Sequence, residues 1–249
     1  AHRAHASTTQ LASFFPNAKM AGLLMNAEIE NAKKVLHKAE RPFTAIVGGA
    51  KVSDKVLIVE NLLQIANHII IGGGMAYTFF KAMGGQIGAS LCEAERVDTC
   101  KEILARAKTM GVQIHLPIDA VVADCFAADA NTKIANSGEI EANWMGLDIG
   151  PKAIETFRAV LLESKTILWN GPMGVFEMPA FENGTKSIAH AVADATKNGA
   201  FSLIGGGDSA AAVQQFELSK EVSYVSTGGG ALLEYFEGKT LPGVEALEA

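Results

Sequence analysis

The segment HIIIGGGMAYTF at residues 68–79 decides the fold: a short run of strand-forming residues ends in three glycines and continues in residues that favour a helix. Gly-Gly-Gly recurs at 205–207 and at 228–230, each time after a run of apolar or β-branched residues. The 25 glycines among 249 residues would give about 0.25 such triplets in random order. The triplets are therefore organised, and each predicts a buried strand, a turn and a helix.

A turn of this kind suits a phosphate group. A strand that ends in bare glycine backbone and reopens as a helix brings several N–H groups and the positive end of a helix dipole to one point. Three such points predict a polyphosphate ligand.

Strands and helices alternate along most of the chain. An apolar stripe predicts a first helix at 21–38. Strands are expected at 44–47, 68–71, 112–116, 120–123, 166–169, 201–204 and 222–225, and helices at 52–66, 75–83, 93–110, 151–164, 185–196, 209–216 and 231–236. The pattern predicts a doubly wound, Rossmann-like α/β fold with a mainly parallel six-stranded sheet and helices on both faces. The polar stretch 124–143 is expected to form a loop or hairpin.

Composition excludes several classes of protein. Hydrophobic residues make up 49% of the chain and charged residues 19%, which is typical of a well-packed soluble protein. The net charge of −6, without a run of Lys and Arg, argues against a nucleic-acid partner. No apolar stretch reaches the roughly 18 residues that a membrane span needs. Cys92, Cys100 and Cys125 lack metal-ligand spacing and are expected to be reduced thiols, which favours the cytoplasm or an organelle such as a plastid.

Ligands of parallel sheets bind at the carboxyl ends of the strands. The residues that follow five predicted strands are all rich in glycine: 48–51, 72–74, 170–172, 205–208 and 227–230. In GGAKVSDK at 48–55, Lys51 and Lys55 lie four apart and are expected on one face of the first helical turns. Cations are disfavoured there unless an anion lies between them, so a phosphate is one interpretation and two solvated lysines are the other.

Three further features leave alternatives open. Asp208, directly after the second triplet, is either a magnesium ligand beside bound phosphates or the N-cap of the next helix. In WNGPMGVFE at 169–177, Asn170 and Glu177 suit the polar groups of a nucleoside, whereas the alternative is a tight loop with Glu177 in solvent. The segment 144–148 is either a wall for a base or ordinary core packing.

Two nucleotide motifs fit poorly. The residues at 205–210 match the GxGxxA dinucleotide fingerprint, but the next strand ends in Val-Ser-Thr at 225–227 without the acid that would hold a ribose. Gly-Lys-Thr at 238–240 matches the end of a P-loop, but Leu233 occupies the position of its first glycine. An NAD-dependent enzyme is therefore the less favoured alternative.

Taken together, the order and spacing of these motifs resemble the phosphoglycerate kinase family over nearly the whole chain. The segments that carry the resemblance are 48–55, 72–79, 144–148, 169–177, 205–209 and 226–230. The resemblance implies two doubly wound domains: an amino-terminal one for 3-phosphoglycerate or 1,3-bisphosphoglycerate, and a carboxyl-terminal one for Mg-ADP or Mg-ATP. This chain resembles the nucleotide half. It is expected to be a fragment, because it starts at Ala1 without an initiator Met.

The resemblance implies a division of the chain into four parts. Residues 1–20 would be a remnant of the amino-terminal substrate domain, and 21–40 the interdomain helix. Residues 41–237 would form the nucleotide-binding domain. The tail at 238–249, which resembles a strand of the family, would return to the missing domain.

The resemblance also implies roles for single residues. Lys55 would contact the transferred phosphoryl group and Lys51 the nucleotide phosphates, and Gly206 and Gly229 would be catalytic through their backbone. The nucleotide-binding residues would be Gly49, Ala50, Lys51, Lys55, Gly73, Gly74, Gly146, Leu147, Asn170, Pro172, Gly174, Val175, Glu177, Gly206, Gly207, Asp208 and Ser209.

The implied activity is reversible phosphoryl transfer between 1,3-bisphosphoglycerate and ADP, with Asp208 as the ligand of the Mg²⁺ that accompanies ADP or ATP. His2 and Arg3 would bind phosphoglycerate, and Arg3 is the one arginine of five that maps to that site. The fragment alone is therefore expected to be weakly active or inactive. The alternative from another class is a non-catalytic nucleotide-binding module. No nucleic acid or membrane partner is expected, and the full-length protein is expected to be a monomer.

Overall fold

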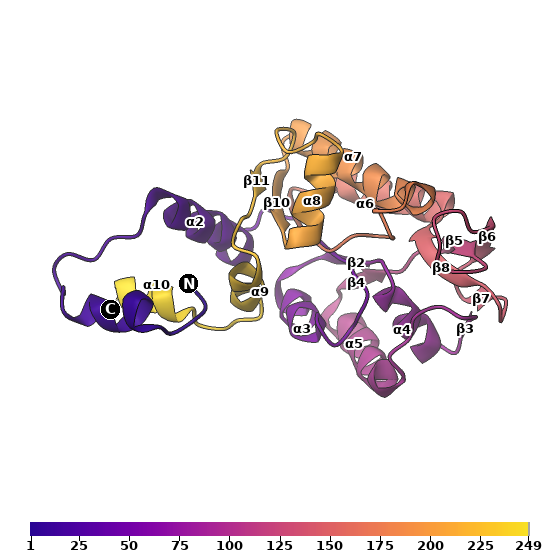
Figure 1. The fold of residues 1–249 in the computed structure, drawn as a ribbon, viewed down its shortest axis with the longest axis horizontal. Coiled ribbons are helices and arrows are strands. Elements are labelled where there is room, and N and C mark those ends of the chain that lie inside the picture. Colours follow the sequence, from indigo (N-terminus) through magenta and orange to yellow (C-terminus); the bar gives the residue numbers. More distant parts are fainter. Residues whose placement is uncertain (249) are drawn as a thin grey trace.

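The computed structural model describes residues 1–248 and is built around one six-stranded sheet in the order β11-β10-β9-β1-β2-β4 (Figure 1). Its strands are β1 (Phe43–Val47), β2 (His68–Ile71), β4 (Gln113–His115), β9 (Thr166–Asn170), β10 (Phe201–Gly205) and β11 (Tyr224–Val225). Every neighbouring pair is parallel. The chain winds outward from β1 in one direction and from β9 in the other, so the doubly wound α/β prediction is confirmed.

Helices cover both faces of this sheet. One face packs against α2 (Leu23–His37), α3 (Val56–Ile65), α4 (Met75–Ala82), α5 (Val97–Met110) and α9 (Gly230–Phe236), and the other against α6 (Pro151–Glu163), α7 (Asn183–Lys197) and α8 (Gly207–Gln215). Along β1, Ala45 and Val47 belong to the first layer and Ile46 to the second, and all three are fully buried. A strand buried on both faces reads as an unbroken apolar run, which is why the sequence predicted it.

A second, antiparallel sheet has the order β6-β5-β8. Its strands are β5 (Asp119–Ala123), β6 (Thr132–Asn136) and β8 (Met145–Ile149), and a small parallel pair joins β3 (Gln86–Ile87) to β7 (Glu139–Ile140). The polar stretch 124–143 thus supplies the loop and the second strand of the β5–β6 hairpin, and also β7. Its loop is closed by Asp124, whose carboxylate accepts hydrogen bonds from the backbone and side-chain N–H groups of Asn131.

A side chain of the second sheet caps the start of α6. Pro151 lies in the first turn of the helix, as predicted. The buried carboxylate of Asp119 accepts hydrogen bonds from the N–H groups of Lys152 at 3.1 Å and Ala153 at 2.8 Å. Gly150 leaves room for this carboxylate, because a Cβ there would lie 2.3 Å from Asp119 Cγ. One side chain therefore joins the small sheet to the helix layer.

The two ends of the chain lie together, to one side of the main sheet (Figure 1). They form the π-helix η1 (Ala6–Gln10), α1 (Leu11–Ser13) and α10 (Pro242–Glu248). The strand that the resemblance implied for the tail is wrong, because Pro242 starts a helix in which the Glu245 N–H bonds to the Leu241 carbonyl. Two short 3-10 helices are η2 (Ala94–Arg96) and η3 (Pro179–Phe181). Among the described residues, no helix is both long and apolar enough to cross a membrane.

Replacing Asp119 by Ala should lower the free energy of unfolding by about 2–3 kcal/mol, because two N–H groups at the buried start of α6 lose their acceptor. Urea denaturation followed by circular dichroism at pH 7 measures the loss. The matched control is Asp194→Ala, which removes a surface ion pair with Arg158 and should cost less than about 1 kcal/mol. Equal losses in the two variants would contradict the capping role of Asp119.

Candidate functional site

A cavity of about 470 Å³ opens where the winding of the main sheet reverses, beyond the carboxyl ends of β1 and β9. Its lining comes from the turns that follow β1, β2, β9 and β10 and from β8 of the second sheet. Ligands of doubly wound proteins bind at such a reversal point. The fold thus collects the glycine-rich turns around one space.

Bare backbone forms one side of the cavity. Gly73 has a φ of +68°, and a Cβ there would lie 2.5 Å from the carbonyl oxygen of Gly49. On β8, a Cβ at Gly146 would lie 1.6 Å from the hydroxyl oxygen of Tyr77. Side chains are excluded at both places because the Gly49 backbone and the Tyr77 side chain already fill the space, so the cavity depends on close packing around these two glycines.

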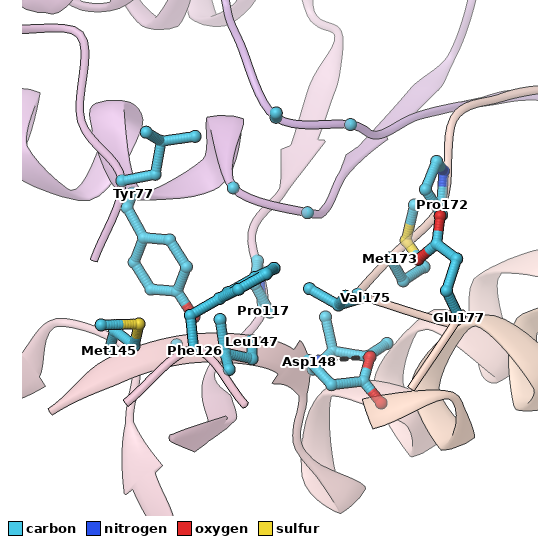
Figure 2. Close-up of a pocket in the computed structure, with 18 of the residues that line it drawn as sticks. Tyr77, Pro117, Phe126, Met145, Leu147, Asp148, Pro172, Met173, Val175 and Glu177 are labelled. Carbon is cyan, nitrogen blue, oxygen red and sulfur yellow. Dashed lines mark hydrogen bonds between the residues drawn. The ribbon is translucent and has the colours of Figure 1, made fainter. Parts of the chain in front are cut away.

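The two ends of the cavity differ in chemistry. Figure 2 shows Tyr77, Phe126 and Leu147 grouped at one end and Pro172 and Glu177 at the other. Tyr77 is buried, whereas 61% of Phe126 is exposed at the rim. The aromatic rings of Tyr77 and Phe126 suit an aromatic ring of a ligand. The exposed carboxylate of Glu177 suits polar hydroxyl groups.

The structure brings most of the predicted binding residues together. Those that line the cavity are Gly49, Ala50, Gly73, Gly74, Gly146, Leu147, Pro172, Gly174, Val175, Glu177 and Asp208. Those that lie at the nearby strand ends, turns and helix starts without lining it are Lys51, Lys55, Asn170, Gly206, Gly207 and Ser209.

The expected arrangement of the two lysines is wrong. Helix α3 begins at Val56 instead of residue 52, so Lys51 and Lys55 do not share a face of its first turn. The later start of α3 is explained by Glu93, which lies 40 residues after Ser53 in the chain. Its carboxylate accepts hydrogen bonds from the N–H of Ser53 at 3.0 Å and from the Ser53 hydroxyl at 2.6 Å. These bonds hold the stretch as a turn. Lys51 is exposed, and Lys55 is half-buried at the N-cap of α3.

The Lys55 side chain extends to the carboxyl end of β9. Its Nζ donates a hydrogen bond to Oδ1 of Asn170, whose Nδ2 donates to the carbonyl oxygen of Gly205 at 2.8 Å. Burial lowers the pKa of the Lys55 ammonium, while the carboxylates of Asp208 and Asp54 act in the opposite direction. Asn170 is buried and holds Lys55 in place, so its side chain does not face the cavity.

Asp208 lies on the first turn of α8, and the N-cap of that helix is Gly206 at a φ of +90°. The interpretation of Asp208 as N-cap is therefore wrong, because a residue without a side chain occupies the cap position. The exposed carboxylate of Asp208 lines the cavity beside the N-terminus of the helix. Helix N-termini carry N–H groups without intrahelical partners, which suit an anion.

A magnesium ion fits this arrangement in one way. Within residues 1–248, His, Cys, Asp and Glu side chains do not gather in groups of three or more that could hold a metal ion. An ion at Asp208 would take one protein carboxylate and its remaining ligands from phosphate oxygens and water, as Mg²⁺ commonly does with nucleotides. A single carboxylate at Asp208 would suit a Mg²⁺ that brings most of its ligands with it.

The hydroxyl of Ser209 has a structural role. It is fully buried and accepts a hydrogen bond from the N–H of Gly171 at 2.6 Å. Helix α8 thereby holds the turn that follows β9. Any contact of Ser209 with a ligand would come from its backbone.

The third glycine triplet is fixed from α2. The carboxylate of Glu28 accepts hydrogen bonds from the Ser226 hydroxyl at 2.5 Å and from the Thr227 N–H at 2.7 Å. Gly229 follows as the N-cap of α9 and does not line the 470 Å³ cavity. The sequence did not indicate Glu28, because an acid in the middle of an amphipathic helix carries no motif.

His2 and Arg3 lie away from this cavity. His2 lines a separate, mainly apolar cavity of about 290 Å³ between α2, α9 and the chain ends. Arg3 is exposed. The described structure therefore does not bring these two residues to the 470 Å³ cavity, although His2 shares the smaller cavity with Thr227 and with Gly228 of the third glycine triplet.

Comparison with known proteins decides the family. The family model "Phosphoglycerate kinase" matches residues 1–239. This chain belongs to the phosphoglycerate kinase family. A curated phosphoglycerate kinase of Porphyromonas gingivalis is 55% identical over 249 residues, which are 100% of this chain and 60% of that relative. The family resemblance read from the glycine turns is confirmed.

Two solved phosphoglycerate kinases share the fold. The structure from Coxiella burnetii is 43% identical with a TM-score of 0.94, over 99% of this chain and 62% of that one. The structure from Pyrococcus horikoshii OT3 is 30% identical with a TM-score of 0.83, over 99% of this chain and 61% of that one. The chain thus spans about three-fifths of the length of the phosphoglycerate kinases it matches.

Tyr77, Phe126 and Asp148 are among the residues of this cavity that the sequence reasoning missed. Tyr77 lies inside a helix and Phe126 in a polar loop, so neither directly follows a strand of the main sheet. A single aromatic residue in the stretch 124–143 was the one available signal for Phe126. Asp148 was predicted only as part of a wall, yet its carboxyl group is buried there. Burial raises the pKa of this group to about 7, although hydrogen bonds from two backbone N–H groups act to lower the pKa.

The close approach of the glycine turns predicts that Gly73→Ala lowers the free energy of unfolding by about 2–4 kcal/mol, through positive φ and collision with Gly49. The matched control is Gly111→Ala, because Gly111 has nearly the same φ of +71° with nothing within 4 Å of a Cβ. That variant should lose about 1 kcal/mol. Urea denaturation measures both, and equal losses would show that the close contact does not exist.

Proposed function

We propose that this chain is the nucleotide-binding part of a phosphoglycerate kinase, which transfers a phosphoryl group reversibly between 1,3-bisphosphoglycerate and ADP to give 3-phosphoglycerate and ATP. The observation that carries the proposal is the cavity, in which an apolar end at Tyr77 and Phe126 and an anion-suited end at Asp208 open into one space. Family membership supports the same assignment.

In this proposal the nucleoside extends from the apolar end toward Glu177. The base would lie against Tyr77, Phe126 and Leu147, and the ribose hydroxyls would bond to the carboxylate of Glu177. The remaining nucleoside contacts would come from Gly49, Ala50, Gly73, Gly74, Gly146, Pro172, Gly174 and Val175, which line the same space.

The phosphates would bind at the start of α8. The N–H groups of Gly207, Asp208 and Ser209 belong to the first turn of that helix and suit phosphate oxygens. Lys51 would bind the nucleotide phosphates and Lys55 the transferred phosphoryl group. Because the Lys55 ammonium has lost hydration through burial, an incoming anion would be attracted more strongly than by a solvated lysine.

The chemistry needs alignment and charge neutralisation more than covalent help. Mg²⁺ bound with the nucleotide at Asp208 would supply neutralising positive charge at the phosphates. Lys55 and the helix starts at Gly206 and Gly229 would hold the transferred group and stabilise its oxygens. No general base is required, since the attacking phosphate and carboxylate oxygens are already ionised.

The second substrate requires more positive charge than this chain offers. A phosphorylated carboxylate calls for a basic cluster. Two of the five arginines already form surface ion pairs, Arg106 with Glu60 and Arg158 with Asp194. His2 and Arg3 would supply part of the phosphoglycerate site. We infer that the chain alone binds Mg-nucleotide and turns over weakly or not at all.

Each part of the chain has its own role in this proposal. Residues 41–237 would form the nucleotide domain, and α2, within 21–40, would connect it to the substrate domain. Residues 1–20 and 238–249 would pack on that domain. The complete enzyme would be a cytoplasmic or organellar monomer that acts on small molecules, without nucleic acid.

A non-catalytic nucleotide-binding module is the second candidate function, and the shortage of free arginines favours it. The two candidates differ in one measurable respect. Adding a separately produced amino-terminal half from the Porphyromonas gingivalis relative should restore phosphoryl transfer between ATP and 3-phosphoglycerate if the chain is part of a kinase. A mixture that binds Mg-ADP but stays inactive would favour the module.

The proposal predicts that Asp208→Ala weakens binding of Mg-ADP by about tenfold or more but changes binding of metal-free ADP by less than about threefold, because one metal ligand is lost. Isothermal titration with and without EDTA measures both. Asp98→Ala is the matched control, since Asp98 is also an exposed acid in the first turn of a helix. Equal weakening of both ligands would contradict the metal role, and no binding of Mg-ADP by the unmodified chain would contradict the proposed function.

A further inference from the structure

Asp148 is a buried carboxylate for which the proposed mechanism has no use. It lies on β8, in the wall of the cavity, and is 3% exposed. The N–H of Gly184, in the first turn of α7, donates to its Oδ2 at 2.6 Å, and the N–H of Ile149 donates to its Oδ1 at 2.9 Å. Burying a carboxylate without a cation partner is costly, so these contacts call for an explanation.

Two glycines make room for this carboxylate. A Cβ at Gly174 would lie 2.2 Å from Oδ1 of Asp148, and a Cβ at Gly184 would lie 2.1 Å from the same atom. Gly174 belongs to the loop at 171–177, which carries the proposed nucleoside contacts. Gly184 belongs to α7. The carboxylate therefore lies where the loop and the start of the helix meet β8.

The residue after Gly184 holds the loop directly. Thr185 is fully buried, and its hydroxyl oxygen accepts hydrogen bonds from the N–H groups of Met173 at 3.0 Å and Gly174 at 3.3 Å. Asp148 fixes Gly184, and Gly184 fixes the position of Thr185. The hydrogen bonds of Asp148 and those of Thr185 are thus linked through the covalent bond between Gly184 and Thr185, from the cavity wall through the start of α7 to the loop.

We propose that Asp148 is a positioning residue for nucleotide binding: through Gly184 and Thr185, its carboxylate holds the loop 171–177 in the form that contacts the nucleoside. The proposal rests on the proposed function, because it presumes that a nucleotide occupies the cavity. It differs from a purely structural role in that it couples the charge of one buried group to nucleotide affinity.

The ionisation of Asp148 provides the readout. Burial raises its pKa to about 7, so the group is mainly a carboxylate at pH 8 and mainly a carboxylic acid at pH 6. The titratable group that faces it from α4 is Tyr77, whose pKa is itself raised by burial and by Asp148. The other charged groups on the surrounding segments are exposed, paired or engaged in capping, namely Asp119, Glu177, Glu182 and Lys186.

The test compares the unmodified chain with Asp148→Asn, which mimics the neutral acid. The ratio of their dissociation constants for Mg-ADP, measured by isothermal titration, cancels the titration of ADP itself. The dissociation constant of Asp148→Asn should be about tenfold higher than that of the unmodified chain at pH 8, where the substitution removes a charged hydrogen-bond acceptor. It should be about twofold higher at pH 6, where Asp148 is itself mainly neutral. A ratio that is the same at both pH values, or no change in affinity, would overturn the proposal.

A second set of variants covers the case in which Asp148→Asn does not fold. Thr185→Val removes the hydroxyl and should weaken Mg-ADP about fivefold, whereas Thr185→Ser should restore affinity to within about twofold. The matched control is Thr196→Val on the same helix, because the Thr196 hydroxyl bonds to Val192 and Ser202, away from the loop. Equal affinities of Thr185→Val and Thr196→Val would overturn the proposal.

The outcomes separate the two levels of inference. If the unmodified chain does not bind Mg-ADP, the proposed function fails and the positioning role fails with it. If the unmodified chain binds Mg-ADP and the variants at Asp148 and Thr185 bind it equally well at pH 8, the positioning role alone is wrong.

Discussion

The turns that follow β1, β2 and β9 touch one another through bare backbone, and the cavity depends on that contact. The N–H of Gly49 bonds to the Pro172 carbonyl at 3.2 Å, and the N–H of Gly73 bonds to the Met173 carbonyl at 3.0 Å. A Cβ at Gly48 would lie 2.1 Å from the Pro172 oxygen. Three strand ends can approach this closely because Gly48, Gly73 and Gly171 have no Cβ at the points of contact.

Side chains in the first turns of α7 and α8 also hydrogen-bond to the turn that follows β9. The Ser209 hydroxyl of α8 fixes the N–H of Gly171, and the Thr185 hydroxyl of α7 fixes the N–H of Met173. The same helix α8 presents Asp208 and its own N-terminus to the cavity. Packing and proposed chemistry are therefore linked, because α8 both stabilises the loop at 171–177 and supplies the dipole for an anion.

Much of this could be predicted from the sequence, because glycine triplets and two-sided apolar strands are local signals. The parallel sheet and the residues after its strands follow from them. What the sequence did not predict depends on partners far along the chain: Glu93 delays the start of α3 by bonding to Ser53, and the wall at Phe126 comes from a polar loop. The sequence left the role of Asp208 open between metal ligand and cap, because Asp fits either role by residue type, and the structure places Gly206 at the cap.

The measurement that tests the central claim most directly is hydrogen–deuterium exchange of this chain with and without Mg-ADP. If the touching turns form the nucleotide site, the ligand should slow exchange at 48–50, 72–74, 171–177 and 206–209. Exchange should stay unchanged at 1–20 and 242–248. Protection confined to the segments around the 290 Å³ cavity, at α2 and α9, would show that the nucleotide binds elsewhere and would contradict the account.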